Sequence, residues 1–167
     1  YDDDTFSEVG TIVIVEDRAP QIDGLVLNDG LEGLSIVKPP YGVLTALDIN
    51  TGERVFQVPH GDTTDDVRAN LERLGLEVPE KAGQGYSVGL IVTKTLVVVG
   101  DPRVTSAPGR ERGAMLRAYD KMTGEEVGAV WMPTQQSGSP MTYMLNGRQY
   151  IIVAVSSGGY TGEYIAF

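Results

Sequence analysis

The chain has 167 residues, among them 21 glycines and 9 prolines, with a formal net charge of -10 and a pI near 4.4. This length suffices for one domain with its own core, and the glycine and proline content favours an all-β fold with short strands and many turns. The negative charge argues against a nucleic-acid or anionic-membrane partner, since either would need a Lys/Arg surface.

Cysteine usage and hydropathy exclude further classes. The chain has no cysteine, which excludes disulfides, zinc-thiolate sites and a thiol nucleophile but does not separate the cytoplasm from the bacterial periplasm. It has no apolar run of about 18 residues and no basic and apolar leader. We therefore expect neither a membrane span nor a signal peptide in the chain as given.

The first half of the chain contains three expected strands. Residues 11–15, Thr-Ile-Val-Ile-Val, form the first, and residues 19–40 have no clear period and are expected to be mostly ordered loop. Residues 43–48 and 54–58 form two strands joined by a turn over residues 49–53.

The turn over residues 49–53 belongs to a unit that occurs twice. Residues 46–53, Ala-Leu-Asp-Ile-Asn-Thr-Gly-Glu, are matched by residues 118–125, Ala-Tyr-Asp-Lys-Met-Thr-Gly-Glu, at an offset of 118 − 46 = 72 residues. A carboxylate in this position accepts hydrogen bonds from backbone N–H groups of its own turn, and glycine supplies the left-handed residue. We therefore interpret Asp48 and Asp120 as turn residues rather than catalytic ones.

A short surface helix is expected between the two copies. Residues 62–64, Asp-Thr-Thr, offer N-caps, and Gly75 is suited to end the helix. Three apolar side chains recur at helical spacing: Val67, Leu71 and Leu74. Residues 90–99 then form an apolar hairpin that turns at Lys94-Thr95, followed by a loop over residues 100–113.

A second hairpin is centred on Asn146-Gly147, the pair that most readily adopts a type I′ turn, between residues 141–145 and 148–155. Because residues 150–155 are almost entirely apolar, both faces of this strand should be covered by other protein layers. A loop over residues 156–162 and a last strand over residues 163–167 complete the expected elements.

Together these elements predict part of a β-propeller with one inserted helix. A blade takes about 40–45 residues, so the 72-residue offset equals one blade plus the insertion. We expect about two to three four-stranded blades: the end of one blade, a helical insertion with its loop, a complete blade and three strands of a final blade, over residues 34–61, 62–89, 90–132 and 139–167. Propellers close with roughly four to eight blades, so the remaining blades should come from another chain or a missing N-terminal part.

The combination and order of several motifs resemble the C-terminal part of pyrroloquinoline-quinone (PQQ)-dependent dehydrogenases. The resemblance is to the membrane-associated glucose, polyol and alcohol dehydrogenase branch and covers residues 34–167. The motifs are Lys-Pro-Pro-Tyr-Gly at 38–42, the two Asp-x-x-Thr-Gly units, Val-Thr-Lys-Thr-Leu at 92–96, Leu-Arg-Ala-Tyr-Asp at 116–120 and Pro-Met-Thr-Tyr-Met-Leu-Asn-Gly-Arg-Gln-Tyr at 140–150.

The resemblance implies a periplasmic eight-bladed propeller, with or without association with the inner membrane, that binds PQQ and Ca²⁺ at the top of its axis. Such an enzyme oxidises an alcohol, polyol or sugar by hydride transfer to the quinone, and electrons leave to ubiquinone or a cytochrome. This sequence has no matching metal-ligand cluster or catalytic Asp motif. We therefore expect the base and the metal ligands outside this chain, which would form part of the propeller wall and the site mouth.

The resemblance also implies which residues face the site. It places Ser139, Pro140, Gly158 and Gly159 at the cofactor, and Tyr160 at the substrate mouth, where sugar-oxidising relatives carry a His. The alternative is that Gly158-Gly159 is merely a loop and Tyr160 a solvent-facing aromatic.

Four other residues are weaker candidates for the site. Arg103, Arg110 and Arg112 could meet the carboxylates of the quinone, although solvated loop cations are the simpler interpretation. His60, as a lone ring, receives no role.

The repeat departs from the family pattern at one aromatic position. The family sets a Trp four residues after the Thr-Gly glycine, where its indole docks between blades, and this chain has Phe56 and Gly128 there. Phe56 can fill such a slot. After Gly128, either Trp131 reaches back through a bulge or the blade packs differently.

Two other functions remain open beside the dehydrogenase. Propellers of this repeat family include a non-catalytic outer-membrane assembly lipoprotein that binds protein partners, so a scaffold is the alternative. The third possibility is that the chain is a degenerate fragment of such a gene and has no activity.

Overall fold

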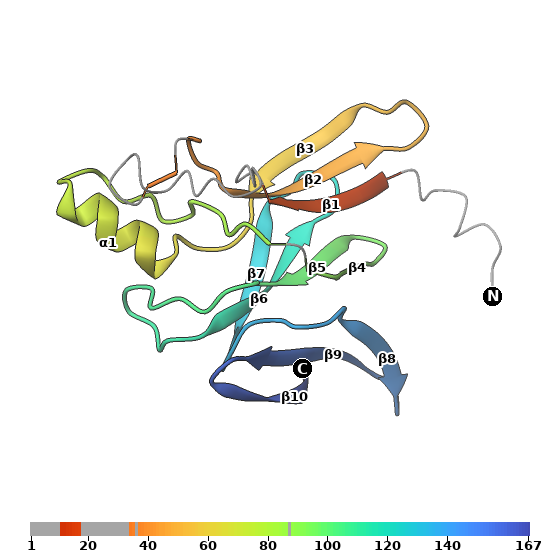
Figure 1. Ribbon diagram of the computed structural model, residues 1–167. Helices are drawn as coiled ribbons and strands as arrows, with labels where there is room; N and C mark the ends of the chain where they lie inside the picture. The colour runs from red at the N-terminus through yellow and green to blue at the C-terminus, as the bar shows by residue number, and fades with distance from the viewer. Residues whose placement is uncertain (1–10, 18–33, 36, 87) are drawn as a thin grey trace.

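The computed structural model describes residues 11–17, 34–35, 37–86 and 88–167. Within these residues, three antiparallel sheets are stacked on one another, and a single helix lies to one side of the stack (Figure 1). This is the all-β fold with one inserted helix that the sequence predicts.

The first sheet has the order β1-β2-β3. Its strands are β1 (Thr11–Asp17), β2 (Gly42–Asp48) and β3 (Arg54–Pro59). Each is one or two residues longer than predicted. The loop expected over residues 19–40 lies largely outside the described residues.

The second sheet has four strands in sequential order. They are β4 (Leu90–Val92), β5 (Leu96–Gly100), β6 (Ala114–Asp120) and β7 (Glu126–Met132). The hairpin predicted at Lys94-Thr95 is confirmed as the β4–β5 turn, because Thr93 N–H donates to Leu96 O at 2.8 Å.

The third sheet has the order β10-β9-β8. Its strands are β8 (Met141–Leu145), β9 (Arg148–Ser157) and β10 (Tyr160–Ala166). The predicted type I′ turn is confirmed, with φ of 51° at Asn146 and 76° at Gly147. On β9, Val153 and Val155 are buried against the second sheet, whereas Ile152 and Ala154 on the other face are only partly covered.

The prediction of a loop over residues 156–162 is wrong. β9 continues to Ser157 and β10 begins at Tyr160, so only Gly158 and Gly159 connect the two strands. Two consecutive glycines can form a two-residue hairpin turn, and a register shift between Tyr160 and Glu163 absorbs the irregularity. The glycines therefore mark a tight turn rather than a long open loop.

The helix, α1, covers Asp65–Arg73 with Thr64 as N-cap, and Gly75 follows it with a φ of 67°. None of its residues is buried, which confirms the expected surface helix. In the part of the chain that the structure describes, no helix has the length and apolar character needed to cross a bilayer.

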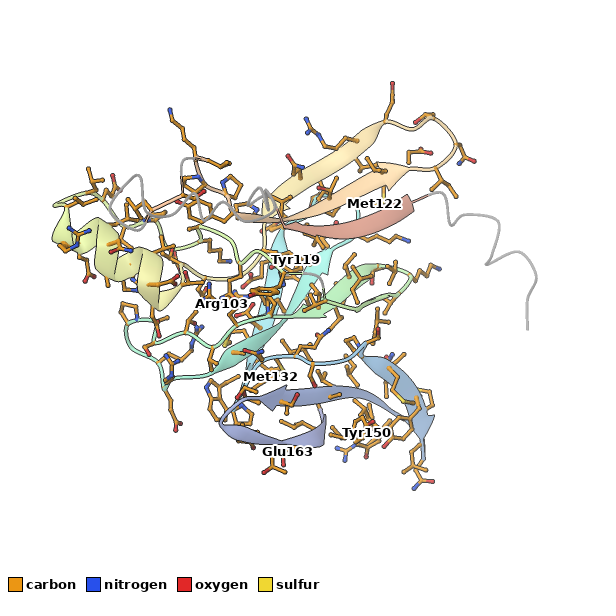
Figure 2. All side chains as sticks on the ribbon, in the orientation of Figure 1. Arg103, Tyr119, Met122, Met132, Tyr150 and Glu163 are labelled. Carbon is orange, nitrogen blue, oxygen red and sulfur yellow. The ribbon has the colours of Figure 1, made fainter. Side chains whose placement is uncertain are left out.

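Two buried clusters hold the three sheets together. Leu44, Ala46 and Phe56 of the first sheet meet Val97, Val99 and Tyr119 of the second. On its opposite face, the second sheet contributes Val98, Ala114, Leu116 and Met132 to a cluster with Val153 and Val155 of the third. Figure 2 shows Tyr119 between the first and second sheets and Met132 between the second and third. The second sheet is thus covered on both faces, as a propeller blade is.

The aromatic position of the repeat is filled in one blade and empty in the next. Phe56 is 8% exposed, and its ring packs on Gly124 of the second Asp-x-x-Thr-Gly turn, where a Cβ would lie 2.6 Å from Phe56 Cδ2. Phe56 therefore fills the predicted slot. Gly128 leaves its counterpart open, because Trp131 instead lies over Gly113, farther along β7, and is 38% exposed. The second blade therefore packs differently.

Candidate cofactor and substrate site

The stack has a turn end and a loop end. At the turn end are the two Asp-x-x-Thr-Gly turns and the β4–β5 and β8–β9 hairpin turns. The N–H of Lys121, in the second Asp-x-x-Thr-Gly turn, donates to Thr95 O of the β4–β5 turn at 2.9 Å. At the loop end are residues 101–113, residues 133–140 and the turn Gly158-Gly159. In Figure 1 the β2–β3, β4–β5 and β8–β9 turns lie on the right, whereas the β5–β6 loop and the β9–β10 turn lie on the left. The segment between β7 and β8 runs from the left to the start of β8 on the right.

The turn-end carboxylates are structural. Oδ1 of Asp48 accepts from the N–H groups of Asn50 and Thr51 at 2.8 and 3.3 Å. Oδ1 of Asp120 accepts from Met122 and Thr123, both at 2.9 Å, and hydrogen bonds from Thr123 and Met122 lower the pKa of Asp120. The prediction that both residues hold turns is confirmed.

At the loop end, Ser139 and Pro140 pack beside the start of β4. Ser139 is exposed and occupies the space where a side chain on Gly89 would otherwise be, while Pro140 is buried. Gly89 therefore allows this close approach, and the Ser139 Oγ lies against Gly89, where a Cβ would be 2.1 Å from it.

The other predicted residues lie farther along β9. Gly138 lies beside Ala154, and Gly158 is four residues beyond Ala154, a separation of about 13 Å at 3.3 Å per residue. Both turn glycines are exposed, and a Cβ on either would meet nothing within 4 Å. The structure thus places Ser139 and the glycine turn at the same end but does not bring them together.

Tyr160 is neither a free surface aromatic nor fully buried. Its ring packs against the cluster between the second and third sheets, and its hydroxyl donates to the carboxylate of Glu163. That hydrogen bond raises the pKa of Tyr160. The alternative of a solvent-facing aromatic does not describe this geometry.

Gln136 joins the loop-end segments, and sequence reasoning missed it. The side chain is 3% exposed, with Oε1 accepting from Gly100 N–H at 2.7 Å and Nε2 donating to Gly89 O at 2.6 Å. The backbone N–H of Gln136 donates to Asp101 O at 3.1 Å, and Gln136 forms an isolated β-bridge with Val155. Gln136 therefore fixes residues 133–140 against β4, β5 and β9.

Replacing Gln136 with leucine should lower the free energy of unfolding by about 2–4 kcal/mol, because the Gly100 N–H and the Gly89 carbonyl would lose their buried partner. Urea denaturation checks this, with Gln149→Leu as the control, since Gln149 is exposed on β9. Equal losses in the two variants would contradict the role assigned to Gln136.

The loop arginines are paired with acidic residues of the insertion (residues 62–89). Arg110 contacts the carboxylate of Asp62, Arg112 that of Asp65, and Arg103 lies 3.7 Å from Asp66. Figure 2 shows Arg103 on the side of the stack where α1 lies. Arg103 and Arg112 remain 42% and 58% exposed, so the interpretation as solvated loop cations agrees with the structure, with a carboxylate beside each of them. A role in quinone contact stays a prediction.

Arg117 lies at the centre of a buried charge network. Nε and Nη2 donate to Asp101 at 2.6 and 3.0 Å, Nη2 donates to Asp62 at 2.8 Å, and Nη1 donates to Glu126 at 3.1 Å. Asp101 is fully buried and Arg117 is 2% exposed. Burial alone would lower the pKa of Arg117, but its bonds and charge interactions with Asp101, Asp62 and Glu126 raise it overall. The network joins the insertion to the second sheet.

His60 is a buried structural residue. Its ring is 0% exposed, with Nδ1 3.1 Å from the Tyr119 hydroxyl and Nε2 3.2 Å from Gly100 O. Burial lowers the pKa of His60, which therefore stays neutral in the folded protein. The expectation that this ring is structural agrees with these contacts.

Because the folded-state pKa of His60 lies below its unfolded value of about 6.5, the unfolded chain binds a proton first as the pH falls. Stability should be full above about pH 6.5 and should decrease below it. Urea denaturation from pH 7.5 to 5.5 measures this slope in the wild type and in His60→Gln. The chain has one histidine, so the slope should disappear in the variant, and an unchanged slope would contradict the assignment.

Among the described residues, no group of three or more His, Asp or Glu side chains is arranged to hold a metal ion. Several carboxylates near the loop end are instead bound to arginines: Asp62 to Arg110, Asp65 to Arg112 and Asp101 to Arg117. These carboxylates are therefore already engaged by cationic side chains of the chain itself.

Stacked antiparallel sheets with a repeated Asp-x-x-Thr-Gly turn define the class: the chain is a segment of a β-propeller. The profile of the PQQ-dependent glucose/ethanol/alcohol dehydrogenase β-propeller domain matches residues 17–151. The chain therefore belongs to this family, which confirms the resemblance. The match begins before residue 34, where the resemblance in the motifs starts.

Two curated relatives and one solved structure are similar to the chain. The chain is 34% identical over 134 residues to the glycerol dehydrogenase large subunit of Gluconobacter oxydans (strain 621H), covering 79% of this chain and 16% of that protein. It is 30% identical over 149 residues to the quinoprotein glucose dehydrogenase of Escherichia coli (strain K12), covering 85% and 17%. A solved quinohemoprotein alcohol dehydrogenase from Pseudomonas putida HK5 aligns with a TM-score of 0.45 and 20% identity over 72% of this chain and 13% of that chain.

The chain spans only a small part of its curated relatives. Alignments cover 14%, 16% and 17% of the length of the quinate/shikimate, glycerol and glucose dehydrogenases, respectively. Most of each relative's length therefore has no counterpart in the aligned part of this chain.

Proposed function

We propose that the chain forms part of the propeller wall and the site mouth of a PQQ-dependent dehydrogenase that oxidises an alcohol, polyol or sugar by hydride transfer to the quinone. The observation that carries this is the family match over residues 17–151 on stacked propeller sheets. Because the matched relatives are named as dehydrogenases of glycerol and glucose, a non-catalytic scaffold is the less favoured function.

On this proposal, the loop end faces the cofactor. Ser139 is an exposed residue whose hydroxyl can donate a hydrogen bond, and the open backbone at Gly158 and Gly159 allows a flat ring to approach closely. Pro140 holds Ser139 in place from a buried position, and Tyr160 lies beside the turn, where it would restrict the substrate.

These residues fit only part of a PQQ site. The quinone's carboxylates need cationic partners, whereas Arg103, Arg110 and Arg112 are already paired with the insertion. We therefore assign the charge-neutralising groups, the Ca²⁺ ligands and the catalytic base to parts of the enzyme beyond the described residues. When bound, a quinone with Ca²⁺ supplies the hydride acceptor and the Lewis acid.

The remaining blades would cover the free face of the third sheet. This face carries the stacked pair Tyr143 and Tyr150, with ring centroids 5.2 Å apart, and three well-exposed apolar side chains. These are Met141 at 53%, Leu145 at 52% and Tyr164 at 80% exposure. Register places all five on the face opposite Val153 and Val155. The partner of this face is therefore another sheet of the same propeller, from the rest of the protein or a separate subunit.

The double variant Met141→Glu/Tyr164→Glu should weaken association with the remaining blades at least about tenfold, because it removes apolar area and places carboxylates in an apolar interface. Sedimentation of the assembly measures this. Met122→Glu serves as the control, since Met122 is 65% exposed on the second Asp-x-x-Thr-Gly turn. Unchanged association in the double variant, or self-association through this face, would contradict the assignment.

The proposed compartment is the bacterial periplasm, with or without association with the inner membrane, and the proposed electron acceptor is ubiquinone or a cytochrome. Blade boundaries at residues 34–61, 90–132 and 139–167, with the insertion at 62–89, are part of the same proposal.

The test of function is dye reduction by the assembly after addition of PQQ and Ca²⁺, with glycerol, glucose and ethanol as substrates. Quinone-dependent reduction with at least one of them is expected. An assembly that contains all the blades and takes up quinone, but reduces no dye with any alcohol, polyol or sugar, would overturn the proposal.

A further inference from the structure

The helix α1 of the insertion contacts the second blade through polar and charged groups. None of the residues of α1 is buried, and no residue of the helix belongs to either apolar cluster. Its first turn nevertheless carries Asp65 and Asp66, which point to the loop over residues 101–113. The contacts between helix and loop are therefore polar and directional.

Asp65 binds both arms of this loop. Oδ1 accepts from Ser106 N–H at 2.7 Å, Oδ2 accepts from Ser106 Oγ at 3.2 Å, and Oδ2 also contacts Arg112. Arg112 in turn donates to Ser106 Oγ at 2.9 Å. Thr105 and Gly113 form the bridge at the base of the loop. Ser106 directly follows Thr105 and Arg112 directly precedes Gly113, so the Asp65 carboxylate binds both sides of the loop at its base.

Asp62 repeats this arrangement closer to the core. Its carboxylate contacts Arg110 from the same loop and Arg117 from β6, and Arg110 also reaches Thr105 Oγ1 at 3.4 Å. Burial alone would raise the pKa of Asp62 and Asp65, but Arg117 and Arg110 lower that of Asp62, and Ser106 and Arg112 lower that of Asp65. Both carboxylates are therefore charged at neutral pH.

The loop that Asp65 binds begins at the loop end, next to the residues assigned to the site. Asp101 O accepts from Gln136 N–H at 3.1 Å, and Gln136 lies three residues before Ser139. A displacement of residues 101–113 can therefore reach the mouth of the site without any contact between Asp65 and a ligand.

We propose that Asp65 is a positioning residue of the dehydrogenase, acting through Ser106 and Arg112 to hold the 101–113 loop at the mouth of the substrate site. This role rests on the proposed function. The Asp65–Arg112 pair is partly exposed, at 39% and 58% of the two side chains, so its effect lies in the order of the loop more than in global stability.

The experiment uses the complete assembly loaded with PQQ and Ca²⁺ and compares Asp65→Ala, Asp65→Asn and Glu72→Gln. Glu72 is an exposed acidic residue of the same helix, so Glu72→Gln removes an equal charge as a control. Two quantities are measured: hydrogen exchange of the 101–113 amides, and KM and kcat for dye reduction.

Asp65→Ala should speed exchange in the loop and raise KM at least about threefold with kcat within about twofold, the pattern of lost substrate positioning. Asp65→Asn keeps one acceptor oxygen, which can still accept from the Ser106 N–H, but it replaces the other oxygen with an NH2 donor and loses the charge. It should therefore show a smaller rise in KM than Asp65→Ala, and it serves as the test variant if Asp65→Ala does not fold. Glu72→Gln should change neither quantity.

Faster exchange in Asp65→Ala with unchanged KM would overturn the positioning role, while dye reduction by the wild type would leave the proposed function intact. Unchanged exchange and unchanged KM would overturn it as well. A wild-type assembly that reduces no dye would overturn the proposed function, and the positioning role with it.

Discussion

Replacing Arg117 with methionine is expected to lower the free energy of unfolding by about 3–5 kcal/mol, the cost of leaving a buried charge without its partner. Asp62 would retain Arg110 and Glu126 would retain Lys81, but Asp101 would keep only the N–H of Met115, at 3.2 Å. Since Asp101 is fully buried, its carboxylate cannot recover solvation from water. Urea denaturation of the purified protein measures the loss.

Two further variants separate the lost ion pair from the lost side-chain volume. Arg117→Met/Asp101→Leu removes both charges and should recover part of the stability, because the desolvated carboxylate is gone. Arg148→Met, at an exposed position of β9, should change the free energy of unfolding by less than about 0.5 kcal/mol. A loss in Arg117→Met no larger than that in Arg148→Met would show that the network does not stabilise the fold.

The second large effect is expected at Phe56, where alanine should cost about 3–5 kcal/mol through lost apolar burial and a cavity. The ring is 8% exposed and packs on Gly124, so it joins the first sheet to the turn of the second. The cavity would lie between two blades, and hydrogen exchange should therefore rise in β2 and β3 before it rises in β9.

Val55→Ala is the matched control for Phe56→Ala, since Val55 is its neighbour on β3 and is 40% exposed. It should cost less than about 1 kcal/mol. Similar losses in the two variants, or exchange that rises equally in all three sheets, would contradict the role of Phe56 between the blades.

Local chemistry made much of the fold predictable. The Asn146-Gly147 turn and the Asp48 and Asp120 turns depend on residues a few positions apart, so their sequence patterns are sufficient to indicate their geometry. The apolar strands and the helix follow from the periodicity of apolar residues in the same way.

The candidate site was less predictable because its contacts join residues distant in sequence. Arg117 meets Asp62 across 55 positions, and Arg112 meets Asp65 across 47. No local pattern shows that a loop arginine already has a carboxylate partner, so a role in quinone binding remained open for these residues. Gln136 gave no signal for the same reason, since a single glutamine becomes informative only when its buried partners are known.

The prediction of a long loop at residues 156–162 was wrong for a different reason. Adjacent glycines fit both an open loop and a two-residue hairpin turn, and only the pairing of β10 with β9 selects the turn. Whether Gly158 and Gly159 face a cofactor depends on the blades that complete the propeller, which their own sequence cannot specify.

If this chain forms one part of a quinone-binding propeller, the native mass of the purified assembly should change on addition of PQQ and Ca²⁺. We expect a particle containing the remaining blades together with this chain, whose mass rises by one bound quinone and its metal. A particle made only of this chain, alone or self-associated, that gains no quinone mass would contradict this expectation.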